Sequence, residues 1–169
     1  KFNTKTNIGS FSGGGVMISG ENMLESERGY VYTDDHNVIC VDRVQMRNET
    51  YEMTADSVVY NSNTEYAQFF TNTNIWDVKE GEYLYADRGA FDKAKSLYIL
   101  TRNGYILTKE QELMCDTLNY YRDRGYVHLK SNIQVDDIKQ KMLMFGDWGE
   151  YWRESGNLFV TREPSAISY

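Results

Sequence analysis

The chain alternates short stretches in which every second residue is apolar with clusters of polar, turn-forming residues. Pairs such as Ala67 with Phe69, and Val127 with Leu129, are typical of β-strands that bury one face. Two such stretches and two polar clusters fill each interval of about 30 residues. The pattern therefore predicts two strands per interval and an all-β, antiparallel fold.

A short signature recurs five times: an apolar residue, any residue, a small residue, an acid, and then apolar residues or Gly two and four positions later. Its clearest copies are Met53–Tyr60, Leu84–Phe91 and Leu113–Tyr120. Successive acids are 29, 31, 29 and 31 residues apart, which indicates a stacked repeat. The acids are Glu27, Asp56, Asp87, Asp116 and Asp147.

The apolar phase changes at each acid, because apolar positions lie three and one residues before it but two and four residues after it. A one-residue slip keeps the same face buried only if the strand bulges or turns a corner. We therefore expect each strand to bend at its acid, which has a structural role, and to hold the preceding small residue inside. Such strands would form an open, V-shaped or twisted β jelly roll with an apolar trough. The small residues are Ser26, Ala55, Ala86, Cys115 and Gly146.

Apolar positions of the alternating strands are expected to line this trough. The candidate trough residues are Ile39, Val41, Phe69, Leu97, Ile99, Leu107, Val127, Leu129, Ile133, Val135, Leu158 and Val160. One repeat position is aromatic and is expected to form a stacked ladder of Tyr60, Phe91, Tyr120 and Tyr151. Because every one of these residues also suits an ordinary core, the pattern leaves both a lipid-lined groove and a solid interior open.

Composition supports strands and narrows the possible partners. The 169 residues suit a single domain over 1–169, and 14 Tyr with one Pro favour sheet. A net charge of −7 makes nucleic acid and anionic bilayer surfaces poor partners. No apolar run approaches the roughly 20 residues of a membrane span. No charged-then-apolar leader sequence follows Lys1, so we expect a soluble chain in mature or trimmed form. Such a chain can be a fragment of a longer repeat array.

Residues with catalytic or metal-binding chemistry do not form a recognisable motif. With strands about 4.8 Å apart, successive acids should lie roughly 9–10 Å from each other, too far to share a metal ion or act as a retaining pair. His36 falls in a turn, and His128 is out of phase with the apolar positions around it. The same geometry separates Cys40 from Cys115, so both should be free. We expect no enzyme activity, no cofactor and no metal site.

The repeated signatures, with hairpin turns and short alternating strands between them, resemble the OstA-like repeat of lipopolysaccharide-transport proteins such as LptA and the N-terminal part of LptD. The clearest stretches are Met53–Tyr60, Leu84–Asp87 and Leu113–Tyr121. The resemblance implies a non-enzymatic β jelly roll in the periplasm of a diderm (Gram-negative) bacterium. It also implies that acyl chains of lipopolysaccharide or a related glycolipid lie in the trough, and that strand edges stack with homologous transport proteins or with a second copy.

Two other functions remain open. A structural or protein-interaction scaffold would have a solid interior, which inward aromatic residues such as Phe69 and Phe91 permit. A carbohydrate-active right-handed β-helix also repeats at roughly 20–30 residues and would use Tyr and Trp as sugar platforms. It would need close carboxylates and three parallel strands per turn, and the paired hairpin turns argue against it.

Overall fold

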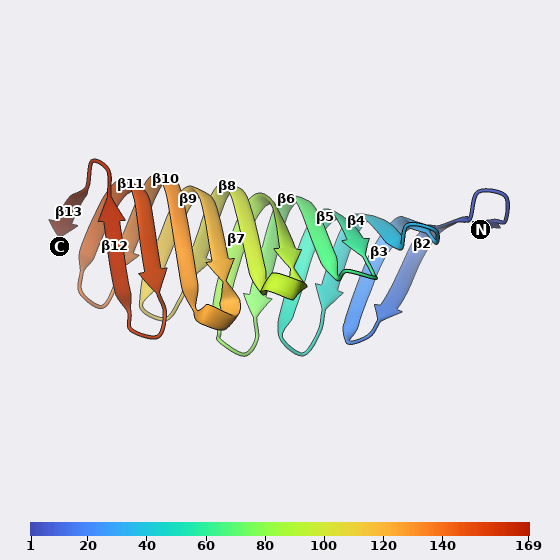
Figure 1. The fold of residues 1–169 in the computed structure, drawn as a ribbon, viewed down its shortest axis with the longest axis horizontal. Helices are drawn as coiled ribbons and strands as arrows, with labels where there is room; N and C mark the ends of the chain where they lie inside the picture. Colours follow the sequence, from blue (N-terminus) through green and yellow to red (C-terminus); the bar gives the residue numbers. More distant parts are fainter.

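The computed structural model describes residues 1–169 as one antiparallel sheet of 13 strands (Figure 1). Strands β1 to β12 follow chain order across the sheet, and β13 pairs with β11. The strands are β1 (Phe2–Asn3), β2 (Ile8–Ser19), β3 (Asn22–Tyr32), β4 (Asn37–Arg47), β5 (Tyr51–Asn61), β6 (Tyr66–Asp77), β7 (Glu82–Asp92), β8 (Leu97–Leu107), β9 (Gln111–Tyr121), β10 (Tyr126–Asp137), β11 (Met142–Trp152), β12 (Asn157–Thr161) and β13 (Ser165–Ser168). The predicted all-β antiparallel repeat fold is confirmed.

Helical structure is confined to two single turns of 3₁₀ helix that close hairpins. These are η1 (Lys93–Lys95), between β7 and β8, and η2 (Arg122–Arg124), between β9 and β10. Ser96 and Gly125 follow them in the left-handed backbone conformation that lets a tight turn rejoin the sheet. No helix in the structure has the length and apolar character needed to cross a bilayer.

The long strands bend at mid-length because two residues on each even-numbered strand oppose one residue on its odd-numbered neighbour. In β4, Asp42 and Arg43 have φ of 65° and 49°, and together they face the single residue Asp56 of β5. Such a bulge changes which face of the strand points inward. The predicted change of phase at the acids is confirmed, although the sharp backbone turn lies in the strand opposite. The equivalent pairs are Gly13–Gly14, Thr71–Asn72, Arg102–Asn103, Ser131–Asn132 and Arg162–Glu163.

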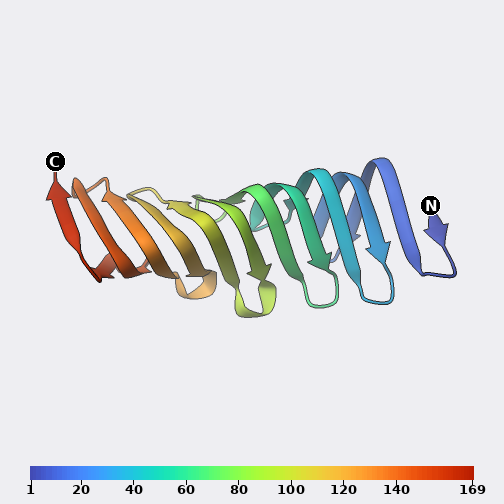
Figure 2. The ribbon, with the colours of Figure 1, turned by 90° about the horizontal axis from the view of Figure 1, so that it is seen from above.

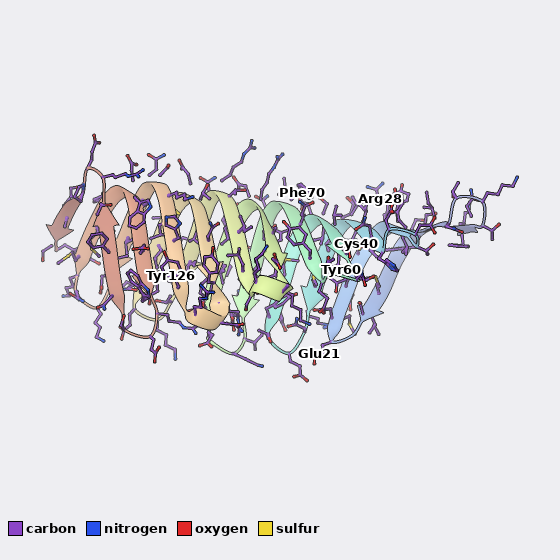
Figure 3. The ribbon with its side chains drawn as sticks, viewed as in Figure 1. Glu21, Arg28, Cys40, Tyr60, Phe70 and Tyr126 are labelled. Carbon is purple, nitrogen blue, oxygen red and sulfur yellow. The ribbon has the colours of Figure 1, made fainter.

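The bends divide the sheet into two half-sheets that face each other. Half-sheet I runs from the bends to the turns at 33–36, 62–65, 93–96, 122–125 and 153–156. Half-sheet II runs from the bends to the turns at 20–21, 48–50, 78–81, 108–110 and 138–141. In Figure 3, Arg28 and Phe70 lie along the upper edge, where the strands bend, and Glu21 lies at the lower edge among the turns. Seen from above, the bent strands follow one another from the N-terminus to the C-terminus (Figure 2).

The inner faces of the half-sheets pack into one core cluster of 27 buried residues. The small residues before the acids face this core, as predicted, and Gly146 is half-buried there. Small side chains suit this position because the two half-sheets converge at the bend and leave little room between them. The other four, each at most 6% exposed, are Ser26, Ala55, Ala86 and Cys115.

Two glycines in the repeat make room for aromatic rings on the neighbouring strand. A Cβ atom on Gly89 would lie 2.5 Å from the ring of Phe69 and would collide with the carbonyl oxygen of Ile99. A Cβ atom on Gly29 would likewise lie 2.5 Å from the ring of Phe11. The ring on one strand therefore fills the space that the absent side chain leaves on the next.

Candidate functional site

The candidate trough residues divide between the two faces of the sheet. Those on β6 and β10 lie between the half-sheets, and those on β12 are half-buried against the same core. The fully buried residues, each at most 2% exposed, are Phe69, Val127, Leu129, Ile133 and Val135. The half-buried ones are Leu158 and Val160.

On β4 and β8 the predicted inner face is wrong by one residue. Ile39, Val41, Ile99 and Leu107 are half-buried on the outer face, and the inner positions belong to Val38, Cys40, Leu100 and Ile106. Leu97 is buried near its strand end, but its neighbour Tyr98 is the member of the core cluster. Both strands carry unbroken apolar runs, so alternation alone has no unique phase there. The pairing register decides it, because Val38 lies opposite the buried Tyr60.

Side chains from both half-sheets fill the interior along its length. Phe69 and Leu100 on half-sheet I, and Leu84 and Val135 on half-sheet II, have no exposed surface. The interior is therefore apolar and continuous, and it is close-packed in the structure.

The two rows of turns meet along the edge opposite the bends, where polar side chains form a seam between the half-sheets. At its centre, Arg122 of half-sheet I donates two hydrogen bonds to Asp77 of half-sheet II, one from Nε to Oδ2 and one from Nη2 to Oδ1 at 3.2 Å. The backbone N–H groups of Lys79 and Glu80 also donate to Asp77, at 3.0 and 2.9 Å. Burial acts to raise the pKa of Asp77, but these hydrogen bonds and the Arg122 charge outweigh it and lower that pKa.

A second link lies next to the first. The Tyr120 hydroxyl of half-sheet I donates to Glu82 Oε2 of half-sheet II at 2.7 Å, and Arg153 Nη1 donates to the same hydroxyl at 2.8 Å. Burial raises the pKa of the Glu82 carboxyl, although Tyr120 and Arg153 oppose that shift. The link is therefore a buried acid held by a hydroxyl and a nearby cation.

The seam continues toward the N-terminus and opens toward the C-terminus. Asn22 Nδ2 of half-sheet II donates to Glu65 Oε1 of half-sheet I at 3.2 Å, and Lys93 pairs with Glu65 at 2.6 Å. Beyond Arg153 the turns at 108–110 and 138–141 stand apart from the turn at 153–156, which leaves a polar groove of about 500 Å³. Tyr151 is the one hydrophobic residue that lines this groove.

Most of the signature acids contact the bulge of a neighbouring strand on the outer face. Asp87 accepts a hydrogen bond from Asn103 Nδ2 at 2.8 Å, and Asp116 accepts one from Asn132 Nδ2 at 2.7 Å. Two other contacts are the Glu27–Arg43 ion pair and the hydrogen bond from the Asn132 backbone N–H to Asp147. These contacts fit the predicted structural role, and three of the four donors are side chains. No group of three or more His, Cys, Asp or Glu residues is placed to hold a metal ion.

Both cysteines are free and buried, as predicted. Burial raises the pKa of Cys115 to about 12 and also raises that of Cys40. His36 is exposed in its turn, while His128 is half-buried on the outer face with its ring 5.2 Å from that of Trp148. These environments give neither thiol the cationic neighbour or low pKa of a nucleophile.

The aromatic ladder is shorter than predicted. Phe91 stacks on Tyr98 at 4.6 Å between ring centroids, and Tyr98 stacks on Tyr120 at 6.2 Å. Tyr98, on the intervening strand, joins the two predicted members into one stack. Tyr60 and Tyr151 lie in the same row, but Ala67 and Val127 follow them on the next strands toward the stack.

Comparison with known proteins gives a family match and similar solved structures. The family of OstA-like proteins matches residues 1–56. A search of curated proteins finds no match. Among solved structures, the chain is similar to LptH, the LptA homologous periplasmic component of the conserved lipopolysaccharide transport device from Pseudomonas aeruginosa. That likeness has 11% identity and a TM-score of 0.39, and it covers 90% of this chain and 99% of that chain. The family match over residues 1–56 agrees with the predicted OstA-like resemblance.

Proposed function

We propose that this chain is a non-catalytic component of lipopolysaccharide or related glycolipid transport in the periplasm of a diderm bacterium. Acyl chains would lie between the two half-sheets. The observation that carries the proposal is a continuous apolar interior. The bent strands close it along one edge, and only side-chain contacts close it along the other. The OstA-like match over residues 1–56 supports the same function.

The seam can open without loss of backbone pairing. Each backbone hydrogen bond between turns joins two turns of the same row. Examples are the bond from Ser62 N–H to the His36 carbonyl in half-sheet I and the bond from Val78 N–H to the Thr50 carbonyl in half-sheet II. None joins one row to the other. The half-sheets can therefore part as two intact layers, at the cost of the seam contacts and of core packing.

Lipid can compensate for that cost. Each buried methylene contributes about 0.8 kcal/mol, so an acyl chain of about a dozen carbons contributes on the order of 10 kcal/mol. Opening the seam exposes Asp77 and Arg122 to water together, so it leaves no unpaired charge buried. Acyl chains can thus replace side-chain contacts across the interior, because both present the same apolar surface.

Stacking on another β domain is supported by the N-terminal edge of the sheet. The first three residues cover β2 only at Ile8, Gly9 and Ser10, so the rest of that edge has free backbone groups. Val16 and Ile18, on the uncovered part, are 62% and 70% exposed. A homologous transport protein or a second copy can add a strand there.

The close packing of the core favours a second candidate, a protein-interaction scaffold. Leu84, Leu100 and Leu118 have no exposed surface, as in an ordinary solid core. A scaffold would use the strand edges alone, and nothing would enter between the half-sheets.

Site-specific photocrosslinking distinguishes the two candidates. A benzophenone amino acid at Leu100, on the inner face of β8, should form adducts with purified lipopolysaccharide, whereas the same probe at the adjacent outer residue Ile99 should not. Phe69 with Gln68, and Leu129 with Lys130, give matched pairs on other strands. If no inner position forms adducts, or if inner and outer positions react equally, the transport proposal fails.

A further inference from the structure

A groove of about 480 Å³ lies on the outer face of half-sheet II, on the opposite side of the sheet from the interior. Its aromatic wall comes from Tyr83 and Tyr85 of β7 and Tyr105 of β8, near the middle of the sheet in Figure 1. The rings of Tyr83 and Tyr105 are 6.0 Å apart, and Trp76 adjoins Tyr83 at 5.6 Å. Trp76 is 43% exposed, so this aromatic row faces solvent.

The repeat itself shows that these tyrosines are not needed to build the sheet. Counted from the acid or the bulge of each repeat, the positions equivalent to Tyr83, Tyr85 and Tyr105 are occupied by a mixture of residues that includes Glu, Gln and Thr. The equivalents of Tyr83 are Met23, Glu52, Glu112 and Leu143. The equivalents of Tyr85 are Glu25, Thr54, Met114 and Phe145. The equivalents of Tyr105 are Val16, Gln45, Asn74, Gln134 and Ser165. Because the same strands form with these residues, the three tyrosines at one repeat require a separate reason.

The rim of the groove is polar and holds no cation. Asn103 and Asn132 stand on the bulges, and each uses its amide N–H to bind an acid, Asp87 or Asp116. The side-chain carbonyl oxygens of both asparagines accept no hydrogen bond within the protein, so they are available to an external donor. No Lys or Arg lines the groove, which disfavours phosphate, sulfate and other anions.

We propose that this outer groove binds a neutral saccharide. Sugar rings have apolar C–H faces that pack on aromatic rings, and Tyr83 and Tyr105 supply such a platform. The hydroxyl groups of a sugar donate hydrogen bonds to amide and carboxylate oxygens. Asn103, Asn132 and Asp116 supply such oxygens at the rim. An acyl chain would fit less well, because it would cover these rim oxygens without offering them donors.

The test is titration of the intact chain with three neutral hexasaccharides, maltohexaose, cellohexaose and chitohexaose, by calorimetry and saturation-transfer NMR. At least one should bind, and Tyr105→Gln should weaken its binding about tenfold through loss of one aromatic contact. Gln is the residue that the repeat itself carries at this position on β4 and β10, so the variant should keep the fold and an unchanged urea midpoint. The matched control, Gln45→Ala, changes the equivalent position of β4 and should bind as the wild type does.

Two results would overturn the proposal. The first is failure of all three hexasaccharides to bind at millimolar concentration. The second is binding that Tyr105→Gln leaves unchanged, because the sugar would then lie elsewhere. Neither result involves lipid or the interior. The saccharide proposal can therefore fail while the transport proposal stands, and the transport proposal can fail while the saccharide proposal stands.

Discussion

The Asp77–Arg122 pair allows the seam to be tested directly. The change Arg122→Met keeps a long apolar stem but leaves the Asp77 carboxylate, whose side chain is 1% exposed, without its counter-charge. Removing one partner of a fully buried pair costs about 3–5 kcal/mol. Arg122 is 16% exposed and two backbone N–H groups still bind Asp77, so we expect a smaller loss of about 2–3 kcal/mol.

Urea unfolding followed by circular dichroism measures this loss. With a slope of roughly 2 kcal/mol per molar urea, the midpoint should fall by about 1 M or slightly more. The matched control is Lys139→Met, which breaks a pair whose side chains are 67% and 57% exposed and should leave the midpoint unchanged. An unchanged midpoint for Arg122→Met would refute the reasoning, as would a double-mutant cycle with Asp77→Asn that shows no coupling.

The same pair sets an acid dependence. Because the folded-state pKa of Asp77 lies below its ordinary 3.8, its stabilisation is present above the ordinary pKa and is lost as pH falls through the folded value. In Asp77→Asn, the midpoint measured from pH 6 downward should therefore fall less steeply below about pH 4 than it does in the wild type.

Three further changes follow from the core and the seam. Gly89→Ala should destabilise the fold by about 1–3 kcal/mol, because its Cβ would collide with the Phe69 ring. The control Gly9→Ala should not, because a Cβ there has its nearest neighbour 3.6 Å away. Equal thermal midpoints for the two variants would contradict this reasoning. Cys115, with a pKa of about 12, should react with iodoacetamide only after unfolding, as mass spectrometry would show; rapid labelling of the native chain would contradict its burial. Glu82 has a raised pKa, so its stabilisation is present below its ordinary pKa and is lost as pH rises through the folded value; Glu82→Gln should therefore gain in urea midpoint relative to wild type as pH increases from 4 to 7.

The sequence alone determined the local design of the fold. The 29- and 31-residue spacing of the acids placed the bends, and the polar clusters between apolar stretches placed the turns. These features are readable because turn chemistry, bulges and alternation involve residues close together in the chain. The same local rules identified the inner face of β10, where Val127 and Leu129 have polar neighbours on both sides.

Only the tertiary structure decided which face is inside where both faces are apolar, and which distant residues meet. On β4 the run from Val38 to Val41 fits either phase, and pairing with the buried Tyr60 selects Val38. Asp77 and Arg122 are 45 residues apart, and no local pattern marks them as partners across the seam. Their contact exists because the bends bring two rows of turns together, and that geometry depends on the packing of the whole sheet rather than on any one segment.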